Sequence, residues 1–193
     1  MGDAGGATAG GRRAARALEV AEGAPLDGLG AGGVLARAHE LCLRWLAVRP
    51  HTRAELGSKL DRRGLPEPLT EAVLVRLTEV GLIDDEAFAG AWVSTRQRGR
   101  GLARRALAHE LRQRGVGAEI VEQAVAAVSA DDERTAARAL VARRLASTTG
   151  LAPQVRQRRL AAVLARRGYG GALAAEVVRE ALDGEPAVGP QAR

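Results

Sequence analysis

Arginine is the residue whose clustering in this sequence could support a chemical function. The 193-residue chain contains 28 arginines and one lysine against 23 acidic residues, which gives a net charge of +6. Residues 134–167 hold nine arginines and no acid, and residues 94–117 hold seven arginines and a single acid, Glu110. A guanidinium group binds phosphate or carboxylate through paired hydrogen bonds, and a surface that served solubility alone would mix both signs. We therefore predict a binding face for an anionic partner.

Two plainer explanations compete with this face: a GC-rich genome raises Arg, Ala and Gly together, and most charged helices are simply solvated. The positions of the arginines are therefore more informative than their number. Arg105 and Arg112 point away from the apolar side of their predicted helix, and Arg158 has the register of Arg105 in the next repeat. Arg96, Arg98 and Arg100 surround a Gly-rich junction, where a flexible loop could follow an anionic groove. The predicted face comprises Arg96, Arg98, Arg100, Arg104, Arg105, Arg112, Arg158 and Arg159.

Catalysis, metal binding and cofactor binding find little support. The three histidines are scattered over different predicted elements: His39, His51 and His109. None has a Cys or carboxylate at the spacing of a metal site, and no Gly-x-x-x-x-Gly-Lys loop is present for a nucleotide. Gly99 and Gly101 do not follow a strand, and Asp84 or Asp85 is better explained as a helix cap. We predict a protein that is not an enzyme and that has no catalytic residue, metal or cofactor.

The elements that must position the arginines are predicted to be helices. Hydrophobic residues make up 46% of the chain but aromatic residues only 2%. A core of Leu, Val and Ala favours closely packed helices, and the β-branched and aromatic runs typical of strands are absent. The fold class is therefore predicted to be all-α. No stretch is long and apolar enough for a membrane span.

An internal repeat organises these helices. The pattern Leu-x-x-x-Leu-x-x-x-Gly occurs three times, at Leu56–Gly64, Leu107–Gly115 and Leu160–Gly168. Each copy predicts a helix that ends at its glycine, which takes the left-handed conformation at little cost. A further helix is predicted after each glycine, at 67–80, 117–129 and 171–183, and another before each pattern, at 33–48, 85–98 and 132–147. Thr52 and Glu55 form a capping-box pattern before the first Leu-rich helix, and Asp131 and Asp132 can cap the helix at 132–147. The predicted organisation is a disordered Gly/Ala-rich extension (1–33), three helical repeats (34–83, 84–130 and 131–183) and a flexible tail (184–193).

The segment that joins the first two repeats resembles a signature of the RecX family. It comprises Gly81, Leu82, Ile83, Asp84, Asp85, Phe88 and Ala89. Arg96, Gly101, Glu110-Leu111 and Arg114-Gly115-Val116 are similar to the pattern that follows it in that family. The resemblance covers about residues 34–182. The third repeat departs from it, because it lacks the Asp-Asp-x-x-Phe signature.

The resemblance implies both an architecture and a function. It implies three tandem three-helix repeats with an elongated, curved shape. It also implies a cytoplasmic regulator that binds the RecA recombinase and its filament on single-stranded DNA. Such a regulator would limit ATP hydrolysis, strand exchange and coprotease activity, and thereby DNA repair, recombination and the SOS response. We expect the unbound protein to be monomeric, and DNA is a further candidate for direct binding.

Two alternatives stay open from the sequence. One is a helix-turn-helix-like DNA-binding regulator, since each Leu-rich helix, Gly turn and following helix superficially fits that motif. The helices that would enter the major groove are acidic, however, with Glu67, Glu71 and Glu79 in the first repeat alone. The other alternative is a helical-repeat scaffold that does not bind nucleic acid.

Overall fold

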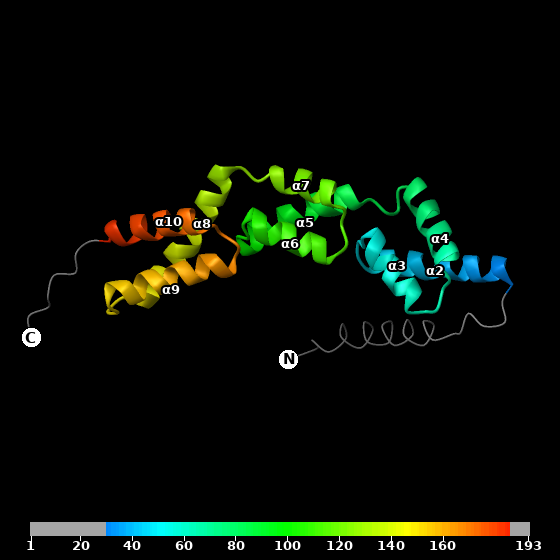
Figure 1. The fold of residues 1–193 in the computed structure, drawn as a ribbon, viewed down its shortest axis with the longest axis horizontal. Helices are drawn as coiled ribbons and strands as arrows, with labels where there is room; N and C mark the ends of the chain where they lie inside the picture. Colours follow the sequence, from blue (N-terminus) through cyan, green and yellow to red (C-terminus); the bar gives the residue numbers. More distant parts are fainter. Residues whose placement is uncertain (1–29, 186–193) are drawn as a thin grey trace, which may run out of the picture. The chain divides into compact units, whose positions relative to one another are not determined.

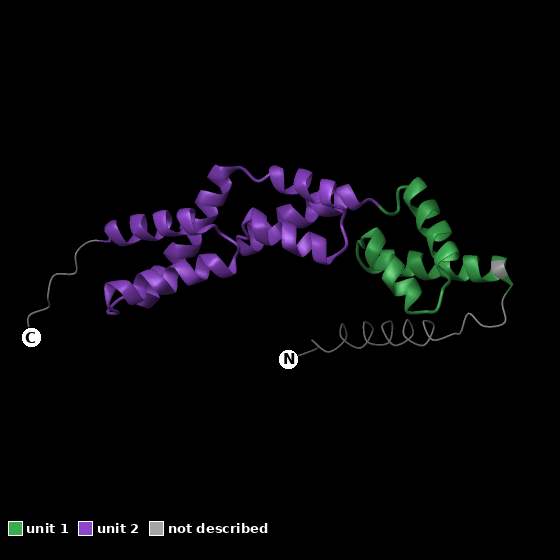
Figure 2. Cartoon of the chain, viewed as in Figure 1, with its two compact units in different colours: residues 1–83 green, residues 84–193 purple. Residues whose placement is uncertain are grey.

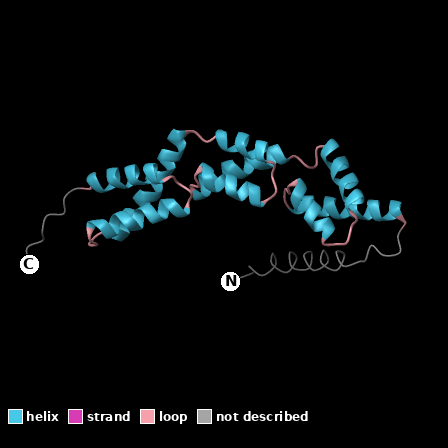
Figure 3. Cartoon of the chain, viewed as in Figure 1, coloured by secondary structure: helices cyan, strands magenta, loops and turns pink. Residues whose placement is uncertain are grey.

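The computed structural model describes residues 30–185, and these residues form helices and connecting loops without a strand (Figures 1 and 3). The predictions for residues 1–29 and 186–193 lie outside this part of the chain. The chain divides into two compact units, residues 1–83 and 84–193 (Figure 2), which are described separately. The all-α class and the three-helix repeats are confirmed.

The first unit contains the first repeat, with helices α2 (Ala31–Val48), α3 (Arg53–Asp61) and α4 (Glu67–Glu79). Helix α2 begins two residues before the predicted start. Thr52 caps α3 as its spacing to Glu55 predicts, because its hydroxyl accepts a 3.1 Å hydrogen bond from the Glu55 amide. Leu56 and Leu60 of the repeat are fully buried in this core, where Trp45 and Leu77 also lie.

The second unit contains the other two repeats. Helices α5 (Asp85–Arg100), α6 (Arg104–Gln113) and α7 (Ala118–Ala126) enclose Phe88, Leu107 and Leu111. Helices α8 (Ala130–Leu145), α9 (Pro153–Arg166) and α10 (Gly171–Asp183), with the 3₁₀ turn η1 (Ala146–Thr148), enclose Leu160 and Leu164.

The predicted N-terminal caps of the helices are confirmed only in part. Of the two predicted candidates, Asp84 and Asp85, Asp84 caps α5, with its carboxylate 2.8 Å from the amide of Ala87. The predicted cap of α8 by Asp131 or Asp132 is wrong. Ser129 is the cap, and Asp132 reaches back to the Ser129 amide at 3.1 Å to complete a capping box.

The three predicted helix-ending glycines are confirmed. Gly64, Gly115 and Gly168 have φ values of +74°, +75° and +89°, in the left-handed region. The apolar residue after each glycine is buried, and its amide bonds back to the second Leu of the pattern. Each copy of the pattern thus reverses the chain at its glycine and buries the apolar side chain that follows.

The predicted flexible loop around Gly101 is instead a packed junction between the second and third repeats. Helix α5 runs to Arg100, and Gly101 ends it with φ +59°. The Ala103 amide donates to the carbonyl oxygen of Arg167 at 3.0 Å, and the Tyr169 hydroxyl donates to the carbonyl oxygen of Gly101 at 3.0 Å. Ala103 itself belongs to the core of the third repeat. The expectation of flexibility was wrong because the glycine serves a helix end and a close packing contact.

Candidate anion-binding surface

Arg96 and Arg100 of the predicted face take part in a network around Glu110 and Trp92. The Trp92 indole donates to the Glu110 carboxylate at 2.9 Å, and that carboxylate lies 3.5 Å from Arg96 and 3.7 Å from Arg100. The guanidinium groups of Arg96 and Arg114 lie 4.1 and 3.8 Å from the centre of the indole ring, a cation–π geometry. The single acid of the 94–117 cluster is therefore the centre of an intramolecular network. The four-residue spacing of Trp92 and Arg96 is the sequence signal that could have revealed it.

Arg104 and Arg98 also bond within the chain. The backbone amide and the Nε of Arg104 donate to the Glu133 carboxylate of α8, at 2.8 and 3.0 Å. This pair joins the second repeat to the third. Arg98 donates to the carbonyl and hydroxyl oxygens of Ser94, one turn earlier. Four of the eight predicted arginines thus have partners on their own chain.

The other four predicted arginines are exposed and have no ion pair or side-chain hydrogen bond within residues 30–185. Arg105 and Arg112 lie on α6, and Arg158 and Arg159 lie on α9. They carry full charges that a partner could bind. Of these four, Arg159 lines a concave site.

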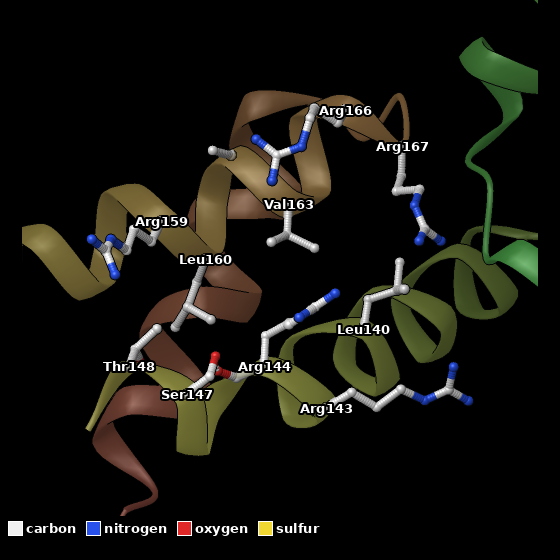
Figure 4. Close-up of a pocket in the computed structure, with 11 residues that line it drawn as sticks. Leu140, Arg143, Arg144, Ser147, Thr148, Arg159, Leu160, Val163, Arg166 and Arg167 are labelled. Carbon is white, nitrogen blue, oxygen red and sulfur yellow. Dashed lines mark hydrogen bonds between the residues drawn. The ribbon is translucent and has the colours of Figure 1, made fainter.

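That site is a groove of about 640 Å³ between α8 and α9 in the third repeat (Figure 4). Helix α8 contributes Arg143 and Arg144, and helix α9 contributes Arg159 and Arg166, with Arg167 at the end of α9. Its other lining residues are Leu140, Ser147, Thr148, Leu160, Ala162 and Val163. We call this site the α8–α9 groove.

Acidic residues of α10 explain which arginines remain available in the third repeat. Arg134 and Arg138 of α8 pair with Glu176 and Glu180 of α10. Arg156 of α9 pairs in the same way with Glu185, just beyond α10. In contrast, no acid lines the α8–α9 groove. The acid-free stretch 134–167 is therefore neutralised on one side and left cationic on the other.

Sequence reasoning missed the three unpaired arginines that line the groove beside Arg159, namely Arg143, Arg144 and Arg166. None of the three has an ion pair or a side-chain hydrogen bond to another described residue. The signal for Arg143 and Arg144 was their spacing of three and four residues from Leu140, which places all three on one face of α8. The sequence alone did not show which face of α8 would be covered by α10.

Two titratable groups of the described residues, Cys42 and Tyr169, have pKa values that burial raises. Residues 30–185 contain no cluster of three or more His, Cys, Asp or Glu that could hold a metal ion. Burial raises the pKa of the Cys42 thiol to about 11, opposite to the shift of a reactive thiol, and burial also raises the pKa of Tyr169 to about 12. No helix in this range is long and apolar enough to cross a membrane.

Family comparisons match each repeat separately. Models of the first, second and third three-helix domains of RecX match residues 38–77, 84–125 and 131–178. The chain belongs to the RecX family. The regulatory protein RecX of Thermobifida fusca is 51% identical over 170 residues, 88% of this chain and 92% of the relative. That of Streptomyces coelicolor is 51% identical over 149 residues, 77% of this chain and 79% of the relative.

Solved RecX structures share the fold. The crystal structure of RecX from Lactobacillus salivarius superimposes with a TM-score of 0.70 at 17% identity, over 76% of this chain and 96% of that one. A second crystal structure of a regulatory protein RecX gives 0.68 at 20% identity, over 89% and 77% of the two chains. The predicted family is confirmed, and the curated relatives are named as regulatory proteins.

The RecX signature segment has a structural role in this chain. Ile83 is buried in the core of the first repeat, and Phe88 and Ala89 are buried in that of the second. Gly81 has φ +72° after α4, and Asp84 caps α5. Leu82 is the exception, because 45% of its surface is exposed. The most recognisable residues of the family therefore help to build the two units.

Proposed function

We propose that this RecX-family protein binds the RecA recombinase and its filament on single-stranded DNA and inhibits the filament's ATPase, strand-exchange and coprotease activities. It would thereby regulate DNA repair, recombination and the SOS response in the cytoplasm. The observation that carries the proposal is membership in a family of regulatory proteins at 51% identity over most of the chain. The resemblance of residues 81–116 supplies the recombinase as the partner.

The proposed contact surface lies on the second unit. Arg105, Arg112, Arg158 and Arg159 are its arginines, because they are exposed and unpaired within residues 30–185. Arg96, Arg98, Arg100 and Arg104 support the fold around them through their bonds to Glu110, Ser94 and Glu133. DNA in the filament and acidic side chains of the recombinase are both suitable ligands for guanidinium groups.

Sequence-specific binding to duplex DNA is less well supported. A helix-turn-helix regulator would place the helix after each glycine in the major groove. In the third repeat this helix is α10, whose Glu176 and Glu180 pair with arginines of α8. An acidic helix that is held against its own repeat is poorly suited to a polyanion.

The proposal is tested by titrating the protein into RecA, single-stranded DNA and ATP and measuring ATP hydrolysis. We expect hydrolysis to fall to a plateau as the protein saturates the filament. An R105E/R112E/R158E variant should require at least about tenfold more protein, since three charge-assisted contacts are reversed. The matched control is R62E/R76E/R179E, which changes the net charge equally at exposed positions outside the proposed surface.

Three outcomes would count against the proposal. Unchanged hydrolysis at saturating wild-type protein would remove the recombinase as the regulated partner. Equal loss in both triple variants would attribute the effect to net charge and not to the proposed surface. Tight binding to one duplex sequence would favour the helix-turn-helix alternative. Circular dichroism of both variants verifies that helicity is retained.

A further inference from the structure

The α8–α9 groove combines cationic walls with an apolar floor. One face of α9 presents Arg159, Val163 and Arg166, and the facing stripe of α8 presents Leu140, Arg143 and Arg144 (Figure 4). Val163 and Ala162 are partly exposed within the groove. A ligand that fills it must therefore be anionic at its edges and apolar towards its centre.

The hydrogen-bonding groups of the groove are its guanidinium groups. The Ser147 hydroxyl donates to the carbonyl oxygen of Arg144 at 2.7 Å, and the Thr148 hydroxyl donates to that of Leu145 at 2.7 Å. Thr148 also accepts a bond from Arg156 at 3.2 Å. Both hydroxyls are therefore engaged, and the available donors are the planar forks of Arg143, Arg144, Arg159 and Arg166. Such forks match carboxylates in paired geometry.

We infer that the α8–α9 groove binds an acidic protein segment that carries an aliphatic side chain. Carboxylates of the segment would pair with the arginines of the walls, and the aliphatic side chain would cover Val163 and Ala162. The concentration of like charge in the groove favours this ligand. Acidic residues in and just after α10 neutralise arginines on the other side of α8 and α9. No acid among the described residues pairs with Arg143, Arg144, Arg159 or Arg166.

A nucleic-acid strand is the weaker candidate for this groove. Proteins that bind single strands commonly stack bases on aromatic side chains, and no aromatic residue lines the groove. A phosphodiester backbone would use the arginines but would leave the apolar floor in water. An acidic segment with an aliphatic anchor uses both.

The inference deepens the proposed function by giving the chemistry of a partner's docking segment, and it rests on that function only for the identity of the partner. The groove itself can be tested without the recombinase. Inhibition of the recombinase without peptide binding would refute the groove's role alone. Peptide binding without any effect on the recombinase would refute only the proposed function.

The test is fluorescence anisotropy of labelled probes with the full-length protein. The first probe is a short Glu-rich peptide with central leucines, the second has serine in place of each leucine, and the third is an oligothymidylate of matched charge. We expect the leucine peptide to bind about tenfold more tightly than the serine peptide, as burial of an aliphatic side chain implies. The oligothymidylate should bind more weakly than the leucine peptide.

Variants assign the binding to the groove. R159A/R166A should weaken binding of the leucine peptide by at least about tenfold, and R62A/R179A, which removes the same charge elsewhere, should not. V163D places an anion on the floor and should weaken binding without removing an arginine. All of these positions are partly or fully exposed, and circular dichroism confirms folding. Equal affinities of the two peptides, no effect of R159A/R166A, or displacement of the peptide by a tighter-binding oligothymidylate would overturn the inference.

Discussion

Gly168 should tolerate a methyl group far less well than Gly64, although both end the Leu-rich helix of their repeats. A Cβ at Gly168 would lie 2.6 Å from the Cβ of Ala106 and 2.8 Å from its amide nitrogen. A Cβ at Gly64 would meet nothing within 4 Å. Both glycines have positive φ, so the comparison isolates the packing of the second repeat against the third.

The expected destabilisation has two parts. An alanine in the left-handed region costs about 1–2 kcal/mol, and this part applies to both G64A and G168A. The clash with Ala106 involves backbone and cannot be relieved by turning a side chain. A shift of the Ala106 backbone would also strain the neighbouring hydrogen bond from Ala103 to Arg167. Overpacking at this contact therefore adds about 1–3 kcal/mol. We therefore expect about 1–2 kcal/mol for G64A and about 2–5 kcal/mol for G168A.

Urea unfolding followed by tryptophan fluorescence measures the effect of each substitution on the compact unit that contains it. Trp45 reports on the first unit in a W92F background, and Trp92 reports on the second unit in a W45F background. G168A should shift the Trp92 transition by more than G64A shifts the Trp45 transition. Equal losses of unfolding free energy, within about 0.5 kcal/mol, would refute the close contact between Gly168 and Ala106.

Three further predictions concern single side chains. E110A should destabilise the second unit by about 1–3 kcal/mol in urea unfolding, because it removes the acceptor of the Trp92 indole and the partner of two arginines. E122A, at an exposed position, is the control and should have little effect. Burial lowers the pKa of His51 despite its hydrogen bond to Glu55, so the unfolded chain takes up a proton more readily than the folded chain. The first unit should therefore lose stability as pH falls below about 6.5. In unfolding curves measured at successive pH values, H51Q should make the stability of this unit less dependent on pH. Cys42, whose pKa burial raises to about 11, should react with iodoacetamide at pH 8 only as fast as the first unit unfolds, and rapid alkylation of the folded protein would contradict its burial.

The helices and the repeat could be predicted because their signals are local. The spacing of two leucines and a glycine determines both a buried face and a left-handed helix end, and Gly64, Gly115 and Gly168 behave alike for that reason. The sequence narrowed the cap of α5 to Asp84 or Asp85, and Asp84 is the residue that caps it. These features depend on residues within one or two turns of each other.

The composition of the arginine surface could not be predicted because it depends on which helices meet. Glu133 lies 29 positions from Arg104, and Glu176 lies 42 positions from Arg134. Only the packed structure shows that Glu133, Glu176 and Glu180 neutralise one set of arginines. The same packing leaves Arg143, Arg144 and Arg166 unpaired, so residues absent from the predicted face line the groove.

Co-sedimentation with recombinase filaments tests the central claim most directly. RecA is assembled on single-stranded DNA with a non-hydrolysable ATP analogue, and the protein is added at increasing concentration. We predict saturable binding to the filament, retained by R62E/R76E/R179E and weakened by R105E/R112E/R158E. A protein that stays in the supernatant at every concentration, while filaments sediment normally, would contradict the claim that it regulates the recombinase by binding its filament.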